Sequence, residues 1–336
     1  MKNEAPANNA PHDIIKSDWR SRILLSASLL LILFLSICYT LHPDALAAFT
    51  TMPIWSWFIV GLLLTAFGWN RKNVFFKLTL ALWLIFLLIF AEEPYSLARA
   101  ILPVADLPKS QNLRVISLNC NSGDPLIASE VAPFKPDIVL LQKSPSRDDV
   151  NKLARQLYGN QAAVLWGVDG SIIARGTIKP RPLASNHSVY FVQGRVRLPE
   201  GYEIEVASLR LMTPPFRIDL WSSDCWNAYT KNRQIQRSQM EVIQQHLQKY
   251  SDVPIVVGGD FNAPQGDAVF NYLTSLKLQD SFRIAGRGWG NTIINDFPAL
   301  RIDQIWASEH LEAHKVLAHK TVSSDHRAVI SDFRRK

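Results

Sequence analysis

Four short segments of this 336-residue chain place carboxylates, amides and a histidine where a predicted strand ends. In the segment 253–264, Asp260 and Asn262 follow a β-branched run and two glycines. Side chains two residues apart in extended chain project from one face, so the two groups are presented together. A carboxylate beside an amide at the end of a buried strand suits phosphate or metal chemistry, and a polar turn is the structural alternative.

The other three segments are Leu-Asn-Cys-Asn at 118–121, Arg-Ile-Asp-Gln-Ile-Trp at 301–306 and Ser-Ser-Asp-His at 323–326. Each segment alone is a weak signal. Their order is specific, because Asp-Ile-Val-Leu-Leu-Gln at 137–142 and Gly-Ser-Ile-Ile-Ala at 170–174 stand between the first segment and Gly-Asp-Phe-Asn. These acids, amides and the histidine are therefore candidates for one functional site.

Short apolar runs alternate with polar turns from residue 113 to the C-terminus, which predicts many strands. One long amphipathic helix is predicted over 226–249. Besides the strand before Asp260, strands are predicted at 113–119, 137–142, 162–166, 171–174, 188–193, 202–211, within 299–307, and at 328–333. Many strands with few helices favour two packed sheets flanked by helices, in one domain of about 230 residues.

Three long apolar runs precede this domain, at 23–41, 52–69 and 74–91. The first holds about 19 uncharged residues, close to what a helix needs to cross a ~30 Å hydrocarbon core. The third contains Lys77, whose long side chain can reach the interface. Buried helices of a soluble core, or a signal peptide for the first run, are the alternatives. Three runs together favour three transmembrane helices.

Basic residues around these runs predict the orientation. They occur at positions 16, 20 and 22 before the first run and at 71 and 72 between the second and third, while 42–51 holds none. Lys and Arg are enriched in cytoplasmic loops. Residues 1–22 are therefore predicted to be cytoplasmic, and three crossings place everything after Glu92 on the other side of the membrane.

The number of cysteines and the net charge indicate whether disulfides stabilise the fold and what kind of partner the protein binds. Three cysteines are too few for a disulfide framework, and Cys38 lies inside the first apolar run. Whether Cys120 and Cys225 pair is left open by the sequence. The formal net charge is +7, and residues 1–107 contribute about +1 of it. The remainder favours an anionic partner such as a phosphoester, nucleic acid or lipid headgroup, with a solvated basic surface as the alternative.

In these motifs the chain resembles the endonuclease/exonuclease/phosphatase superfamily, and it looks most like bacterial members with N-terminal membrane helices. The resemblance covers 113–336, and Gly-Asp-Phe-Asn and Ser-Asp-His are its strongest parts. It implies an α/β (α+β) fold, a four-layered α/β sandwich of two packed sheets, with the acids, amides and histidine of these motifs together at the top of the sheets. It also implies hydrolysis of a phosphoester by water with the help of Mg²⁺ or Mn²⁺, which neutralise charge in such reactions.

The resemblance assigns roles to the catalytic candidates residue by residue. Asp260 would align or deprotonate the attacking water, and Asn262 would hold the phosphoryl oxygens. Asp303 would hydrogen-bond to His326, fixing its tautomer and favouring its protonated form. Asn119 would contact phosphate or metal. Asp325 would approach the metal.

The chain departs from the family pattern at three positions. Lys143 stands where the family has a metal-binding Glu, and an ammonium there would repel Mg²⁺. The preceding Gln142 is a poor substitute, because neighbouring strand residues point to opposite faces. Arg210 stands where the family usually has a catalytic His, and Asn121 where many relatives have Asp.

These substitutions leave three interpretations open. Lys143 and Arg210 neutralise a bound phosphate without the usual metal, or a metal still binds weakly through Asp260, Asp325 and Asn119. In the third, hydrolysis is lost and anion binding is kept. The alternative to all three is that Lys143 and Arg210 are ordinary surface residues without a role in the site.

The sequence thus predicts a membrane-anchored, Mg²⁺-dependent phosphoester hydrolase with an atypical metal site, with a catalytically silent binder of phosphorylated ligands or anionic lipids as the alternative. Its expected division is a tail at 1–22, an anchor at 23–91, a linker at 92–112 and the catalytic domain at 113–336. That domain would face away from the cytoplasm of a bacterial inner or plasma membrane. Substrate selectivity is expected in the loop 214–228, where Trp221 and Trp226 suit base stacking, lipid contact or core packing.

Overall fold

The chain forms two compact units in the computed structural model, which describes residues 10–69 and 74–336, with side chains from residue 19 onward. The helical unit comprises Met1–Pro43 and Met52–Ala91, and the sandwich unit comprises Asp44–Thr51 and Glu92–Lys336. The predicted tail 1–22 falls partly outside the described residues. So do Arg71 and Lys72, on which the predicted orientation partly rests.

The helical unit contains α1 (Ala10–Leu41), α3 (Ile54–Phe67) and α4 (Val74–Phe90). Trp19–Leu41 is 23 residues long with a mean hydropathy of 2.4, enough to cross a membrane. The other two helices are 14 and 17 residues long, and they reach spanning length only together with the bent helices next to them. The described residues thus contain one clear candidate span, and up to three, where the sequence predicts three.

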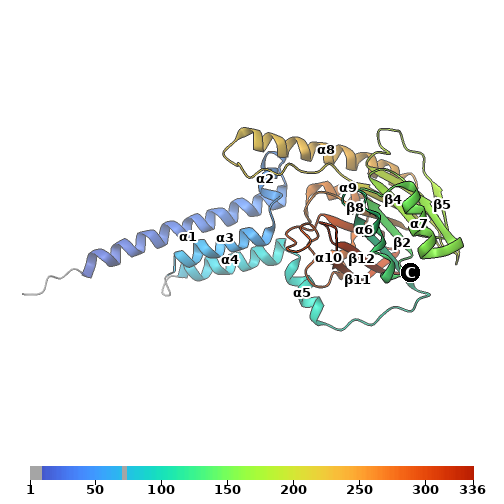
Figure 1. Cartoon of the computed structure of the whole chain (residues 1–336). Helices are drawn as coiled ribbons and strands as arrows, with labels where there is room; N and C mark the ends of the chain where they lie inside the picture. Colours follow the sequence, from blue (N-terminus) through green and yellow to red (C-terminus); the bar gives the residue numbers. More distant parts are fainter. Residues whose placement is uncertain (1–9, 70–73) are drawn as a thin grey trace, which may run out of the picture. The chain divides into compact units, whose positions relative to one another are not determined.

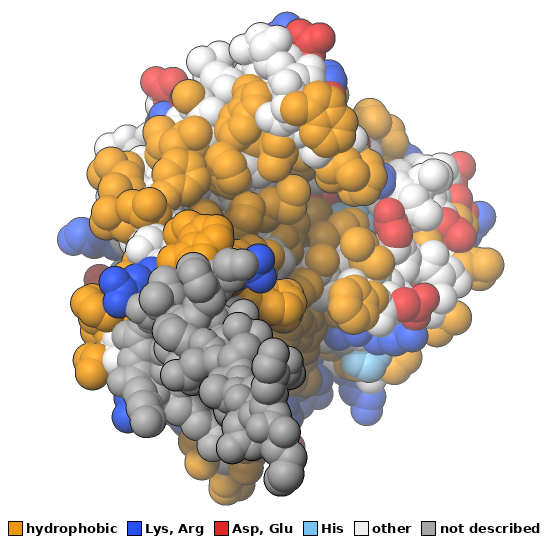
Figure 2. Space-filling model, turned by 90° about the vertical axis from the view of Figure 1, so that its left-hand side faces the viewer, with side chains coloured by type: hydrophobic (Ala, Val, Ile, Leu, Met, Phe, Trp, Pro, Cys, Tyr) orange, Lys and Arg blue, Asp and Glu red, His pale blue; other side chains and the backbone are white. Residues whose placement is uncertain are grey.

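Small residues allow these helices to pack closely. A Cβ atom on Gly61 would lie 1.8 Å from the Trp83 ring, so α3 must have glycine where α4 presents its tryptophan. The indole Nε1 of Trp83 donates a hydrogen bond to Ser28 Oγ at 2.8 Å, which ties in α1. Hydrophobic side chains also gather on the face drawn in Figure 2. Leu30, Leu33, Leu63 and Leu88 are among those exposed on the outside of this unit.

The sandwich unit is built on two six-stranded mixed sheets, in the orders β11-β12-β1-β2-β4-β3 and β5-β6-β7-β8-β10-β9. The strands of the first sheet are β1 (Asn112–Asn119), β2 (Ile138–Gln142), β3 (Ala162–Leu165), β4 (Gly170–Arg175), β11 (Leu311–His319) and β12 (Ala328–Arg335). Those of the second are β5 (Thr177–Pro180), β6 (Phe191–Arg197), β7 (Glu203–Arg210), β8 (Ile255–Asp260), β9 (Gln279–Asp280) and β10 (Asp303–Ala307).

Helices cover the outer faces of the two sheets (Figure 1). The main core lies between the two sheets. On the first sheet, α6 (Pro125–Ser129) and α7 (Arg147–Tyr158) bury a second apolar cluster. On the other sheet, α8 (Ser223–Gln248) and α9 (Asn271–Ser275) bury a third. The sandwich unit also contains α2 (Ala47–Thr50), α5 (Glu93–Ile101) and α10 (Ser281–Ala285). The predicted four-layered sandwich is confirmed.

Strand register brings the polar strand ends to one edge. β1 and β2 run parallel with Asn119 beside Gln142, and β7 and β8 run parallel with Arg210 beside Asp260. A hydrogen bond of 2.9 Å from Asn119 Nδ2 to Asp260 Oδ2 joins these strand ends across the two sheets. We call this edge the site edge.

Several elements differ from the sequence expectation. β5, β9 and β11 were not predicted, because each is short or partly exposed and has no long apolar run. Residues 188–190 precede β6 instead of beginning it, and α8 begins at Ser223. The segment 92–112 contains α5. All three cysteines are buried and unbonded, which answers the question of a Cys120–Cys225 pair.

Candidate active site

Three titratable side chains that are distant in sequence converge at the site edge. One ligand atom each of Asp260, Asp303 and His326 lies within 4.8 Å of the others, and all three side chains are buried. Asp260 ends β8 and is paired with Asp303 at the start of the antiparallel β10. His326 lies two residues before β12. Neighbouring strands therefore bring together groups that are separated by up to 66 residues in the chain.

Two glycines before Asp260 are required by close packing. A Cβ atom on Gly259, whose φ is +152°, would lie 1.9 Å from the carbonyl oxygen of Leu209 on β7. A Cβ atom on Gly258 would lie 2.7 Å from Leu140 in the opposite sheet. The Gly-Gly pair thus lets β8 approach both neighbours and sets the position of the carboxylate that follows.

The imidazole of His326 is held in one orientation. Its Nδ1 lies 2.8 Å from Asp303 Oδ2, and its backbone N–H donates to Ser324 Oγ at 3.0 Å. Burial alone would lower the pKa of His326, but the charge and the hydrogen bond of Asp303 outweigh burial and raise it to about 9. The pairing with Asp303 therefore favours the protonated form of His326 at neutral pH.

The second ring nitrogen of His326 is an open donor. Its nearest polar neighbours are Asn119 Nδ2 at 3.4 Å and Asp325 Oδ1 at 4.0 Å. Asn119 Nδ2 is itself a donor and is engaged with Asp260, while 4.0 Å is too long for a hydrogen bond. Within the described residues the protonated Nε2 thus has no acceptor, and a buried charged donor without an acceptor favours an anionic ligand.

Asp260 is a carboxylate with a raised proton affinity. Its Oδ1 accepts the backbone N–H of Asn262 at 3.0 Å, and its Oδ2 accepts Asn119 Nδ2 at 2.9 Å. Burial, followed by the charge of Asp303, raises the pKa of Asp260 to about 6. A carboxylate in this range is ionised at neutral pH and can still accept a proton from water.

Arg210 lies beside this carboxylate. Its Nε is 3.9 Å from Asp260 Oδ2, its Nη1 is 3.3 Å from Asp169 Oδ1, and its Nη2 donates to the Thr213 hydroxyl at 3.0 Å. The Nε atom is buried and has no hydrogen-bond partner within the described structure. The guanidinium is therefore held at the site edge with one donor unused.

Lys143 follows directly after β2, with a left-handed φ of +44°. Its side chain is half-buried. The preceding Gln142 is fully buried, donates to Ser208 Oγ at 3.2 Å and accepts from Ser117 Oγ at 3.3 Å. Because Gln142 is committed to the space between the sheets, it does not replace the missing Glu.

The remaining candidates lie around this centre. Asn119 accepts the backbone N–H of Asn121 at 3.0 Å, so its amide positions both Asn121 and Asp260. The Nδ2 of Asn262 donates to Leu211 O at 2.8 Å, which leaves only its second N–H for a phosphoryl oxygen. Asp325 is half exposed.

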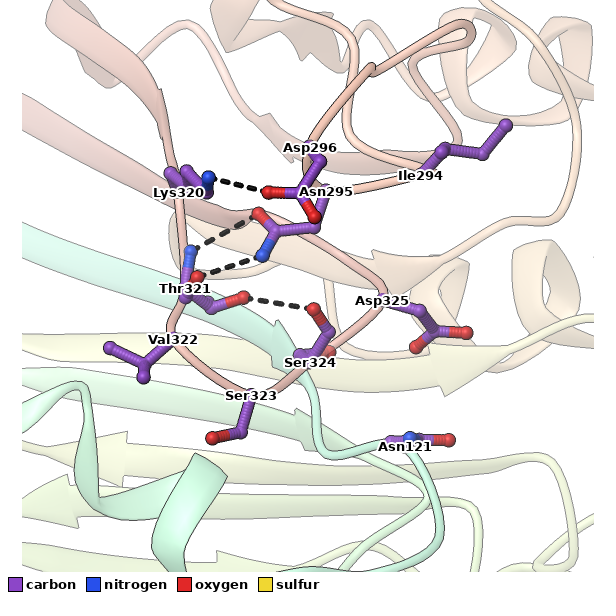
Figure 3. A pocket seen from close by; sticks show the side chains of 10 residues that line it. All are labelled: Asn121, Ile294, Asn295, Asp296, Lys320, Thr321, Val322, Ser323, Ser324 and Asp325. Carbon is purple, nitrogen blue, oxygen red and sulfur yellow. Dashed lines mark hydrogen bonds and ion pairs between the residues drawn. The ribbon is translucent and has the colours of Figure 1, made fainter.

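A pocket of about 770 Å³ adjoins the site and shares Asn121 and Asp325 with it. Figure 3 shows these two side chains near one another, with Ile294 and Val322 farther along the lining. An ion pair of 2.5 Å between Lys320 and Asp296 crosses another part of the wall. The site therefore opens into a space large enough for a substrate group beyond the phosphate.

Sequence reasoning missed several residues that position the site. Asp169 pairs with Arg210, and the Thr292 hydroxyl accepts the backbone N–H of Asp303 at 3.1 Å. Gln236 on α8 donates to the carbonyl oxygen of Asn262 at 3.0 Å. These residues are common surface types at positions with no motif, and only the fold shows their proximity.

A buried cluster of charged side chains lies next to the start of β10. Arg301, which is 1% exposed, pairs with Glu92 at 2.6 Å and with Asp280 at 2.5 Å. We expect Arg301→Met to lower the free energy of unfolding by about 3–5 kcal/mol, because two buried carboxylates lose their counter-charge.

Urea unfolding of the full chain in detergent, followed by tryptophan fluorescence, measures this effect. The matched control is Arg334→Met, which removes an exposed pair with Glu312 and should change stability by no more than about 1 kcal/mol. Equal effects of the two changes would show that the Arg301 cluster adds no more than a surface ion pair.

The donor set at the centre fits a divalent cation. Asp303 Oδ1 is buried and has no hydrogen-bond partner among the described residues, and one oxygen of the Asp303 carboxylate lies within 4.8 Å of one of Asp260. Mg²⁺ and Mn²⁺ prefer such hard oxygen ligands. The protonated His326 would not be a ligand, so the two carboxylates would hold the ion.

The sequence model of the endonuclease/exonuclease/phosphatase family matches residues 116–326, more than half of the chain and all of the candidate site residues. The chain belongs to this family. The predicted family is thereby confirmed. Comparison with curated proteins gives no match.

Solved structures of this family share the fold. The endonuclease/exonuclease/phosphatase from Beutenbergia cavernae is 18% identical with a TM-score of 0.50, and the match covers 67% of this chain and 72% of that one. A mannosyl-6-phosphatase from Bacteroides thetaiotaomicron is 15% identical with a TM-score of 0.51, covering 66% and 99%. A family protein from Bacteroides thetaiotaomicron is 14% identical with a TM-score of 0.52, covering 67% and 98%. At these identities the likeness concerns the fold alone.

Proposed function

We propose that the chain is a membrane-anchored phosphoester hydrolase in which His326, Arg210 and Asp260 act on one phosphoryl group. The observation that carries this proposal is the buried His326–Asp303 pair, whose Nε2 donor has no acceptor, next to an ionised Asp260. Charge on the oxygens of a reacting phosphoryl group needs cationic donors, and the attacking water needs a base. His326 and Arg210 supply the cationic donors and Asp260 supplies the base. A ring nitrogen of His326 lies within 4.8 Å of the Asp260 carboxylate, and Arg210 Nε lies 3.9 Å from it.

In the proposed mechanism the site residues have different roles toward the phosphoryl group and the attacking water. His326 donates from Nε2 to a phosphoryl oxygen, and Asp303 keeps the ring charged and oriented. Asp260 orients the attacking water and accepts its proton. Arg210 adds positive charge with its unused Nε–H, and Asp169 and Thr213 keep the guanidinium in place.

A divalent cation, Mg²⁺ or Mn²⁺, would be held by Asp260 and Asp303 and would neutralise phosphoryl charge when bound. Lys143 weakens such a site in our proposal, because its ammonium stands where a carboxylate would otherwise add a ligand. Asn119 and Asp325 are further candidates for contacts with the metal ion through their side-chain oxygens.

Replacing Lys143 by glutamate tests this account of the metal. We expect Lys143→Glu to raise Mg²⁺ affinity about tenfold or more, since a repulsive charge becomes an attractive one close to the ion. Calorimetry on the full chain in detergent measures the affinity. Lys135→Glu is the control, because Lys135 also has a left-handed φ, of +50°, but lies at the opposite end of the strands. Unchanged affinity in Lys143→Glu would show that Lys143 does not face the ion.

Hydrolysis of bis-p-nitrophenyl phosphate by the purified full chain tests the function itself. We expect release of nitrophenolate that Mg²⁺ stimulates and a chelator suppresses. A rate equal to that of buffer, together with retained binding of inorganic phosphate, would reject hydrolysis in favour of the silent binding domain.

We further propose that the apolar helices anchor the chain with the sandwich unit on the non-cytoplasmic side of a bacterial inner or plasma membrane. The length and hydropathy of Trp19–Leu41 support the anchor, and the basic residues around the apolar runs support the side. Alkaline phosphatase fused after Lys336 should be active in a bacterial host, since it requires the non-cytoplasmic side. A cytoplasmic reporter that is active at the same position would contradict three crossings.

A further inference from the structure

Exposed hydrophobic side chains of the sandwich unit lie in two places, on and just after α5 (Tyr95, Leu97, Ile101 and Leu102) and around the site edge. Between residues 103 and 336, all of which the structure describes, every exposed large hydrophobic side chain except Ile284 lies on a turn, loop or helix start that adjoins this edge. Six of them flank the site on the loops before β10, before β12 and after β7. We call these six the apolar rim: Phe216, Ile218, Trp221, Ile294, Phe297 and Val322.

The rim is exposed although its backbone is held in place. Phe216 is 99% exposed, Trp221 is 87% and Val322 is 89%. The loop that carries the first two is fixed to α8 by Asn232 Nδ2 to Thr213 O at 2.9 Å and by Tyr229 Oη to Arg217 O at 3.0 Å. Single exposed hydrophobic residues are ordinary, but a group around one cleft marks a surface that meets an apolar partner.

The rim also borders both places where the sandwich unit continues into the apolar helices. Asp44 pairs with Arg237 at 2.9 Å on α8, the helix that fixes the Phe216 loop. Glu93 accepts a hydrogen bond from Asn291, which lies three residues before Ile294.

Chain length keeps these junctions near the membrane helices. Asp44 comes three residues after Leu41, the last residue of α1, and Glu92 comes two residues after the end of α4. Three residues span at most about 11 Å, so neither junction can lie far from the end of an apolar helix. The chain therefore tethers these two junctions, which adjoin the rim, to the ends of the apolar helices.

The pocket beside the site opens within this rim. Ile294 and Val322 line it together with Asn121 and Asp325 of the site (Figure 3). A phosphoryl group at His326 would thus have apolar side chains beside the remainder of the molecule that carries it.

We propose that the apolar rim inserts into the surface of the bilayer and that the site takes its phosphoester from a membrane-resident molecule. The occupant of the rim is the lipid bilayer, and the substrate class is a phosphoester with an acyl or alkyl tail. The docking is independent of catalysis, whereas the substrate class rests on the proposed hydrolase function.

Spin labels test the docking without any use of activity. All native cysteines are buried, so a nitroxide can be placed selectively at Phe216→Cys, Val322→Cys and Glu309→Cys in the full chain. Glu309 is exposed two residues after the other end of β10 and is the control. In vesicles of phosphatidylcholine and phosphatidylglycerol, labels at 216 and 322 should collide more with oxygen and less with a water-soluble nickel chelate than the label at 309.

Equal accessibility of the labels at 216, 322 and 309 would overturn the proposal. Protection of the two rim labels from both quenchers would also overturn it, because that pattern indicates a protein partner instead of lipid.

A pair of matched substrates tests the substrate class. p-Nitrophenyl hexadecyl phosphate in vesicles and p-nitrophenyl methyl phosphate in water share the reacting diester and differ in the tail. We expect Phe216→Ser with Trp221→Ser to lower kcat/KM at least tenfold on the hexadecyl ester and to leave the methyl ester unchanged. Equal effects on both esters would overturn the membrane-resident substrate. Lipid insertion of the rim with no hydrolysis of either ester would uphold the docking and reject the hydrolase.

Discussion

The variant His326→Gln is expected to hydrolyse bis-p-nitrophenyl phosphate with a kcat lower by a factor of about 10²–10³. Glutamine can still accept or donate one hydrogen bond, but it removes the positive charge that faces the phosphoryl oxygens. Loss of one preorganised donor at a developing charge costs about this much. The reason the effect should be large is burial, since His326 is only 3% exposed and water cannot replace it.

His310→Gln is the matched control for this experiment. His310 is exposed in the turn between β10 and β11, at the end of β10 away from Asp303. It should keep the wild-type rate, and circular dichroism should show both variants folded. Equal rates in wild type and His326→Gln would remove the histidine from the mechanism.

The variant Asp260→Asn is expected to lose a factor of about 10²–10⁴ in kcat, the range for a general base. Asparagine keeps the size of the side chain but offers one acceptor oxygen to the two donors Asn262 N and Asn119 Nδ2, so circular dichroism and Mg²⁺ affinity should be measured beside the rate. Asp252→Asn is the control, because Asp252 is exposed and pairs with Arg195 away from the site. A full rate in Asp260→Asn would mean that another group activates the water.

The pH dependence follows from the directions of the two pKa shifts. Asp260 acts as the carboxylate and has a pKa of about 6, so kcat should fall as the pH drops below about 6. His326 acts in its protonated form and has a pKa of about 9, so kcat should fall as the pH rises above about 9. Asp260→Asn should abolish the acid limb, and His326→Gln the alkaline one. A profile that is flat from pH 5 to 10 would contradict both assignments.

The sequence predicted most strands because buried strands carry strong local signals. The β-branched run before Asp260 and the polar residues at the strand ends marked the candidate residues, and the resemblance to the family implied that they meet. β11 lacked this signal, because several of its side chains are partly exposed and polar residues interrupt its apolar ones.

The partners of the substituted cations could not be predicted from the sequence. Arg210 is held by Asp169, 41 residues earlier, and nothing in the local sequence around Asp169 marks it. Gln142 and Lys143 show the same limit, since only packing reveals that the amide is committed to Ser208 and Ser117. The two tryptophans of the predicted selectivity loop also differ. Trp226 packs against Phe49, and its indole N–H donates to Leu220 O. Trp221 is exposed, so its side chain is free to contact a ligand or lipid.

The central claim is that side chains far apart in sequence hold a charged imidazole beside an ionised carboxylate. Nuclear magnetic resonance of ¹⁵N-histidine in the full chain, with His326→Gln to assign the signal, measures that charge directly. We predict that the His326 ring titrates near pH 9, and that in Asp303→Asn its pKa falls substantially. A wild-type ring that titrates near its ordinary pKa of about 6.5 would contradict the account.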